Sequence, residues 1–238
     1  MLRRPLILTL ALFASIPATG LLQGCSSSGK AAGIRQVDDL NSRIERVHLE
    51  SELSRERIKS VMDSLRDVVT MDQDADVVET FAAFTAAIAA SESQSKKLRS
   101  SLGPMKSSAD AVFARWTQNL GDFSSADMRR RSTNRMDETR ARYDEIVSNV
   151  EPAVTNFEIF NSGLRDLSLF LGHDLNTQAV HSVGREVQVL ADDAITLNTK
   201  LVATLEACRE YVRAAAPTGN AVVDRTAEKP ESGEAKPQ

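Results

Sequence analysis

The residue in this sequence with the clearest chemical role is Cys25, a thiol placed where acyl chains could be attached. It ends the run LLQGC, which closes an apolar stretch that follows the basic residues Arg3 and Arg4. A basic start, an apolar middle and a small residue before a cleavage site have the plan of a secretory signal. We therefore predict a signal peptide over residues 1–24, with Cys25 as the first residue of the mature chain.

A cysteine directly after such a cleavage site resembles the lipobox of bacterial lipoproteins, in which Gln23 is less usual. The resemblance implies acyl chains on Cys25, and more than one chain anchors a protein stably in a membrane. Because Ser26 follows the cysteine, and aspartate does not, it also implies sorting to the inner leaflet of the outer membrane, facing the periplasm. A plain cleaved signal and an uncleaved anchor stay open as alternatives, although a membrane-spanning helix needs about 20 apolar residues.

Three acidic residues, Asp72, Asp74 and Asp76, have the spacing that opens a calcium-binding loop. Such a loop also needs glycine at its sixth position and glutamate at its twelfth, where this chain has Val77 and Ala83. The motif therefore fails, and we expect a solvated turn in which Asp76 caps the following helix.

A basic stretch offers a second kind of chemistry. Its members are Arg129, Arg130, Arg131, Arg135, Arg140 and Arg142. Acidic residues surround them, so ion pairs on a solvated helix face are the favoured interpretation. Binding of an anion or a lipid headgroup stays open as the alternative.

The remaining reactive side chains predict neither a metal site nor a catalytic group. The histidines His48, His173 and His181 have no metal-binding spacing. Cys208 lies on an apolar stripe, which indicates a buried, inert thiol, with disulfide-linked dimerisation as the alternative if it is exposed. No nucleophile elbow, phosphate-binding loop or dinucleotide fingerprint is present, so we expect no enzyme and no cofactor.

The composition predicts a helical core with few aromatic residues and excludes broad binding of nucleic acid. The net charge is −4, and it becomes −6 when a signal holding two arginines and no acids is removed. Aromatic residues make up 5% of the chain, so a core must be built from alanine, valine, leucine and isoleucine. A mildly acidic chain also disfavours general binding to anionic lipid.

The elements that carry these residues are predicted from apolar side chains that recur every three and four positions. This spacing runs from Val37 to Val68, from Val77 to Phe123 with an interruption at Gly103-Pro104, from Met128 to Leu171, and from Val183 to Val212. We predict an all-α protein, an elongated antiparallel bundle or coiled coil of about four long helices. The predicted divisions are a tether over 25–34, a bundle over 35–213 and a disordered tail over 214–238.

Two details of the periodic pattern bear on function. Serine replaces an apolar residue at Ser51, Ser54, Ser91 and Ser95, which indicates looser packing where a partner or a second copy could dock. An alanine-rich segment, Ala82 to Ala90, could leave room for a ligand between helices. Trp116 and the pairs Phe81/Phe84 and Phe157/Phe160 are interpreted as core anchors.

Several short segments of the second half together resemble one bacterial lipoprotein family, catalogued as domain of unknown function 2959. They read FARW from Phe113, RRRSTNR from Arg129, TRARYD from Thr139, EPAVTNF from Glu151 and HDLNTQAV from His173. The resemblance covers roughly residues 36 to 213. It implies a helical, envelope-associated protein, and it brings no catalytic residues.

The sequence thus favours a non-enzymatic structural or interaction module of the cell envelope. Its expected partners are the membrane, through Cys25, and either an envelope protein or a second copy of the chain. The alternative is a periplasmic carrier of a lipid or another apolar ligand, and an envelope hydrolase is the least favoured interpretation.

Overall fold

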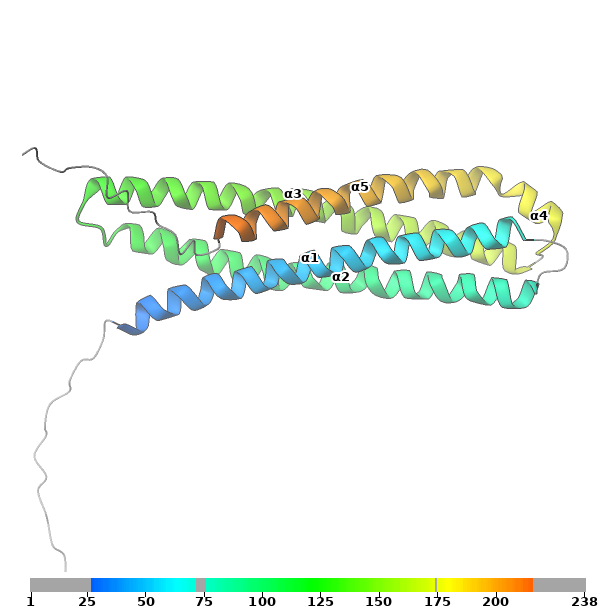
Figure 1. Cartoon of the computed structure of the whole chain (residues 1–238), viewed down its shortest axis with the longest axis horizontal. Coiled ribbons are helices and arrows are strands. Elements are labelled where there is room, and N and C mark those ends of the chain that lie inside the picture. Colours follow the sequence, from blue (N-terminus) through cyan, green and yellow to red (C-terminus); the bar gives the residue numbers. More distant parts are fainter. Residues whose placement is uncertain (1–26, 72–75, 174, 216–238) are drawn as a thin grey trace, which may run out of the picture.

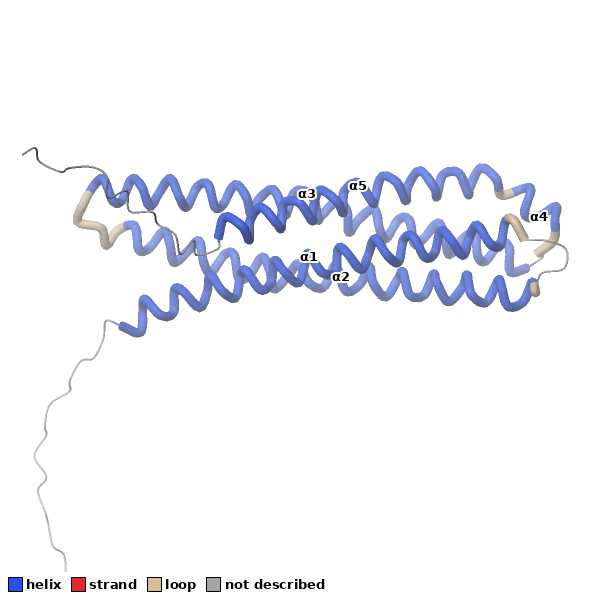
Figure 2. The backbone as a smooth tube through the Cα atoms, in the orientation of Figure 1, coloured by secondary structure: helices blue, strands red, loops and turns tan. Residues whose placement is uncertain are grey.

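The computed structural model describes residues 27–71, 76–173 and 175–215, and within these ranges the chain forms helices without strands (Figures 1 and 2). The helices are α1 (Ser27–Val69), α2 (Val77–Leu120), α3 (Ala126–His173), α4 (Thr177–Ser182) and α5 (Gly184–Ala215). The predicted all-α class is confirmed. The signal and Cys25 lie outside the described residues, as does the tail from residue 216.

The four long helices form a ring in which consecutive helices run antiparallel. α1 contacts α2 and α5, and α3 contacts the same two helices. The start of α1, the α2–α3 turn and the end of α5 lie at one end, which we call the proximal end (Figure 1). The end of α1, the start of α2 and α4 lie at the opposite, distal end (Figure 1). Short connections impose this up-and-down arrangement.

The predicted apolar stripes meet along the axis of the ring. Each helix contributes side chains that solvent does not reach: Leu40, Ile44 and Leu65 from α1; Phe84, Leu98 and Met105 from α2; Ile146, Phe157 and Leu164 from α3; Leu197 and Leu201 from α5. Burial of each such side chain contributes about 1.5–3 kcal/mol. The sequence pattern missed Ala207 and Tyr211, which are also buried. Val37 and Val77, predicted on the stripes, stay exposed, and Val77 is the first residue of α2.

The predicted break near Pro104 is wrong, because α2 continues through it as one helix. Proline removes one hydrogen bond of the helical ladder, usually at a cost of about 3 kcal/mol. Pro104 lies on the exposed face of α2, where water can satisfy the freed carbonyl of Ser100. Leu98 and Met105, both fully buried, hold the helix against the core on either side. Tertiary packing therefore outweighs the local signal.

The helix starts partly follow the sequence signals. Asp76 caps α2 as predicted, accepting a hydrogen bond from the backbone N–H of Glu79 at 3.0 Å. At the start of α3, Ser125 accepts a hydrogen bond from the backbone N–H of Met128 at 3.3 Å. α1 begins at Ser27, so residues 27–34 are helical and not the predicted tether.

Charged side chains close the outer seam between α2 and α3. Three ion pairs cross it at seven-residue intervals: Glu92 with Arg165, Arg99 with Glu158, and Lys106 with Glu151. Seven residues are nearly two helical turns, so the pairs stay on one face of both helices. They follow the antiparallel register of α2 against α3. In the described ranges, no helix has the length and apolarity needed to cross a membrane.

Candidate functional site

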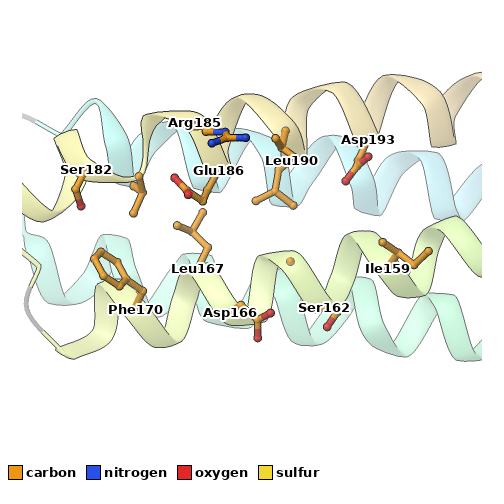
Figure 3. A pocket seen from close by; sticks show the side chains of 13 residues that line it. Ile159, Ser162, Asp166, Leu167, Phe170, Ser182, Arg185, Glu186, Leu190 and Asp193 are labelled. Carbon is orange, nitrogen blue, oxygen red and sulfur yellow. The ribbon is translucent and has the colours of Figure 1, made fainter.

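An open groove of about 740 Å³ runs between α3 and α5 in the distal half of the bundle (Figure 3). Its floor is apolar and buried, formed by Leu167 of α3, Leu190 of α5, and Val183, which precedes α5, each 4% exposed. Figure 3 shows Leu167 and Leu190 pointing toward one another from the two helices. The volume falls within the range of small-molecule sites, about 300–1,000 Å³.

A glycine lets the two helices approach closely at the floor. A Cβ atom added to Gly163 would lie 2.9 Å from Cδ2 of Leu190, closer than real Cβ atoms come. Gly163 and Leu167 are four residues apart and share one face of α3. The close approach at Gly163 therefore positions Leu190 in the floor of the groove.

Large apolar side chains also stand exposed along the groove walls. Ile159 is 61% exposed, Phe170 52% and Val189 51%, and all three line the groove. Single exposed apolar residues are ordinary, but a group around an apolar floor is typical of an interaction site. The groove can thus bury apolar surface of a partner without rearrangement of the core.

The charges at the groove are mostly negative. Asp166, Glu186 and Asp193 line it together with one cation, Arg185, which leaves two negative charges in excess. Figure 3 shows Glu186 pointing toward Leu167, so a carboxylate lies over the apolar floor. This rim favours a ligand with an apolar face and basic flanks.

The serines expected to mark a docking surface lie instead inside the bundle. Ser51, Ser54 and Ser91 are fully buried, and Ser95 is 3% exposed. They belong to a polar layer to which all four long helices contribute, completed by Glu50, Gln94, Asn161 and Thr204. The expected loose, partner-binding patch is therefore an internal layer of the chain itself.

Hydrogen bonds explain why this layer can be buried. Ser91 Oγ donates to Asn161 Oδ1 at 2.6 Å, which ties α2 to α3. Gln94 Nε2 donates to Glu50 Oε2 at 2.7 Å, which ties α2 to α1, and Arg46 pairs with the same carboxylate at 2.7 Å. A buried polar group without such a partner costs about 1–3 kcal/mol.

The sequence pattern missed Glu50, Gln94 and Asn161 because it counted only apolar side chains. Each of them lies on the buried face of its helix, so its place in the helical repeat could have predicted its burial. The hydroxyl of Ser95 is buried without a partner among the described residues. The layer therefore fixes the relative register of the helices and presents no surface for binding.

The alanine-rich segment does not open a space between helices. Ala82, Ala83 and Ala86 lie on the exposed face of α2, whereas Phe84 and Ile88 point inward and fill the core. The expected ligand space is therefore not here, and the groove between α3 and α5 takes its place as the candidate.

The basic stretch of α3 makes ion pairs, in line with the favoured interpretation. Arg130 and Arg131 share Asp127, the second at 2.6 Å, and Arg129 donates to the carbonyl of Phe123 at 2.8 Å. The guanidinium of Arg140 lies over the ring of Phe113, 4.3 Å from its centroid. These contacts order the side chains but leave the stretch positively charged.

The other predicted residues fall into separate places. Cys208 is buried, as predicted, and burial raises the pKa of its thiol to about 12, which keeps it protonated and inert. His48 accepts a hydrogen bond from Arg209 at 3.1 Å. Asp72 and Asp74 lie outside the described residues. Within the described part, no three residues of the metal-binding types gather into a possible site.

Trp116 lies at the side of the bundle and not in its core. It is half-buried, and its indole Nε1 donates to Ser132 Oγ at 2.9 Å, which joins α2 to α3 near the proximal end. The predicted anchors Phe84, Phe157 and Phe160 are buried, whereas Phe81 is only half-buried.

The comparisons with known proteins give a family and no further relative. No curated protein and no solved structure matches the chain. Residues 27–215, the whole helical bundle, match the family described as "Protein of unknown function (DUF2959)". Because the match covers every described helix, the chain belongs to that family.

Proposed function

We propose that this chain is a non-enzymatic lipoprotein of the cell envelope, anchored through Cys25, that binds a helix of a partner protein in the groove between α3 and α5. The observation that supports it is the apolar floor of that groove, open to solvent and flanked by exposed Ile159, Phe170 and Val189. An amphipathic helix fits such a groove with side chains spaced three and four residues apart.

The charges of the rim select the chemistry of the partner. Two excess negative charges favour a helix whose apolar stripe is flanked by lysine or arginine. They disfavour groove-to-groove pairing of two copies, because the same acids would face each other. We therefore favour a basic envelope protein over self-association.

The length of the bundle supports a role as a spacer. α1 has 43 residues, which at about 1.5 Å per residue span roughly 65 Å. The groove lies in the distal half, whereas the helix that follows Cys25 begins at the proximal end (Figure 1). An anchor in the inner leaflet of the outer membrane would hold the groove out in the periplasm.

Site-specific photocrosslinking in cells tests the groove. A photoreactive residue at Val189, which lines the groove, is compared with one at Ile195, which is 66% exposed on the same helix but not part of the lining. We expect a protein product at Val189 alone, joined through a basic amphipathic helix, and its loss when Glu186→Lys and Asp193→Lys are added. Equal products at both positions, or none at Val189, would contradict the proposal.

The volume of the groove also supports a second candidate function, transport of an apolar ligand. Native mass spectrometry of the purified protein distinguishes the two. A reproducible bound small molecule that disappears with Val189→Glu favours the carrier. An empty protein that retains its crosslinked partner favours the interaction module.

The anchor is tested separately. Mass spectrometry of the N-terminal peptide should show Cys25 carrying acyl chains, and Cys25→Ser should prevent their addition. An unmodified Cys25 in the mature chain would overturn the lipoprotein part of the proposal and leave the groove untouched.

A further inference from the structure

The α2–α3 hairpin tip, residues 114–142, has a charge opposite to that of the chain. It holds seven arginines against four acidic residues, a formal charge of +3, whereas the whole chain carries −4. The remainder of the chain is therefore at −7. Because the bundle is elongated, this separation of charge places a positive region at its proximal end, while the remainder is negative (Figure 1).

This tip lies beyond the buried core of the bundle. The core ends at Phe113 on α2 and Tyr143 on α3, and every residue from 114 to 142 is exposed or half-buried. Figure 1 shows the α2–α3 turn reaching beyond the end of α5. The first part of α1 runs beside the α2 arm of the tip, where Gln36 and Val37 line a hollow together with Trp116, whereas Arg129, Arg130 and Arg131 at the start of α3 are exposed.

The local contacts favour anion binding over neutralisation. One carboxylate, that of Asp127, pairs with two arginines, Arg130 and Arg131, so one positive charge remains in excess. The N-terminus of α3 adds the positive end of its helix dipole at the same place. Met128 is 49% exposed between these groups and offers apolar contact at an interface.

The position of the tip relative to the anchor indicates its partner. α1 begins at Ser27, two residues after Cys25, and its start lies at the same end of the bundle as the tip. We propose that the α2–α3 hairpin tip lies against the anionic headgroups of the membrane that holds Cys25. This inference rests on the lipid anchor of the proposed function.

The contact would orient the protein. Acyl chains at Cys25 and a basic surface at the tip supply the two signals that fix a protein stably on a membrane. The excess negative charge of the remainder is repelled by an anionic surface, so the groove between α3 and α5 points away from it. A local basic surface is thus present although the net charge of the chain is mildly acidic.

Vesicle sedimentation tests the tip without the anchor. The unacylated protein from Cys25 onward is mixed with vesicles of phosphatidylglycerol or of phosphatidylcholine. We expect binding to the anionic vesicles only, and its loss at about 0.5 M salt, where screening is strong. Each basic residue near an anionic surface contributes about 1 kcal/mol, or roughly fivefold in affinity. The double variant Arg130→Gln and Arg131→Gln should therefore weaken binding about tenfold or more.

The distal end of α1 offers a matched control. Lys59 and Arg66 share Asp63 just as the two tip arginines share Asp127, so Lys59→Gln with Arg66→Gln makes the same change in charge. This variant should bind like the wild type, and circular dichroism should show the same helix content in both. Equal weakening by both variants, or no preference for anionic vesicles, would overturn the proposal. Because this protein carries no acyl chain, either result is independent of whether Cys25 is modified in cells.

Discussion

The two outer seams of α3 are built differently. Against α2, three ion pairs at seven-residue intervals cross the surface, and a buried hydrogen bond from Ser91 to Asn161 joins the helices inside. Against α5, the described residues form no ion pair, and in the distal half the surface opens into an apolar groove. One seam is closed by the chain itself, whereas the other leaves apolar surface uncovered. The contrast indicates which side of α3 is available to a partner.

The largest expected effect is on the free energy of unfolding, and it distinguishes a core residue from a residue of the groove wall. Phe157→Ala removes a fully buried ring and should lower the free energy of unfolding by about 3–5 kcal/mol. Phe170→Ala, on the groove wall, should cost less than about 1 kcal/mol, because that ring is already half exposed. Urea unfolding of the two variants measures the difference. A loss of stability at Phe170 as large as at Phe157 would show that the groove is part of the closed core.

Three buried titratable groups on α3 and α5 should also make stability respond to alkaline pH. Burial raises the pKa of Cys208 from 9.0 to about 12 and that of Tyr211 and Tyr143 from 10.0 to about 12. These groups stay neutral in the folded protein at a pH where the unfolded chain ionises them, so their stabilising effect is full below pH 9. The free energy of unfolding should fall between pH 9 and 12, by up to about 1.4 kcal/mol per pH unit for each group.

Cys208→Ala provides the control for this pH response. The variant loses the thiol, so its stability should fall less steeply from pH 9 upward than that of the wild type, whatever its stability at neutral pH. Thermal melts across the pH range measure both slopes. Identical slopes would mean that the thiol is not desolvated as its burial implies.

An intermediate effect is expected inside the α2–α3 seam. Asn161→Ala removes the acceptor of the Ser91 hydroxyl and leaves a buried donor unsatisfied, which should cost about 1–3 kcal/mol. The double variant with Ser91→Ala should recover part of that loss, because no polar group is then left buried without a partner. A double-mutant cycle measures the coupling, and a coupling near zero would contradict the bridge.

The smallest effect is expected for the surface ion pairs of the same seam. Removing one pair by Arg99→Gln should cost less than about 1 kcal/mol, because both partners are largely exposed to solvent. The difference should shrink further at high salt. A loss of several kcal/mol would mean that the ion pairs, and not the buried contacts, hold α2 against α3.

The sequence predicted the helices well because their signal is local. Apolar residues such as Leu40, Phe84 and Leu164 recur at helical spacing, and any helix that contains them must bury that face. The same reasoning failed at Pro104. The free-energy cost of a proline inside a helix depends on whether water can bind the carbonyl that has lost its hydrogen bond, and on how the residues on either side are packed. It also placed the start of α1 too late, since residues 27–34 lack a strong periodic pattern.

The candidate site was beyond the reach of the sequence. Ile159, Phe170 and Val189 resemble core residues in type and lie off the apolar stripes of their helices, so spacing accounts for their exposure, but only the arrangement of α3 against α5 brings them around one groove. Conversely, the serines expected at a surface are buried because Asn161, Gln94 and Glu50 come from other parts of the chain to meet the layer. Partners distant in sequence cannot be assigned from periodicity.

The sequence by itself determined the number of long helices, their antiparallel order and the placement of positive charge near the start of α3, because each depends on neighbouring residues and short connections. Only the tertiary structure decided which seam is closed, which exposed apolar side chains lie around one groove, and that the basic tip and the start of α1 share one end of the bundle. These features depend on how four helices pack around a common axis, and such packing joins residues far apart along the chain.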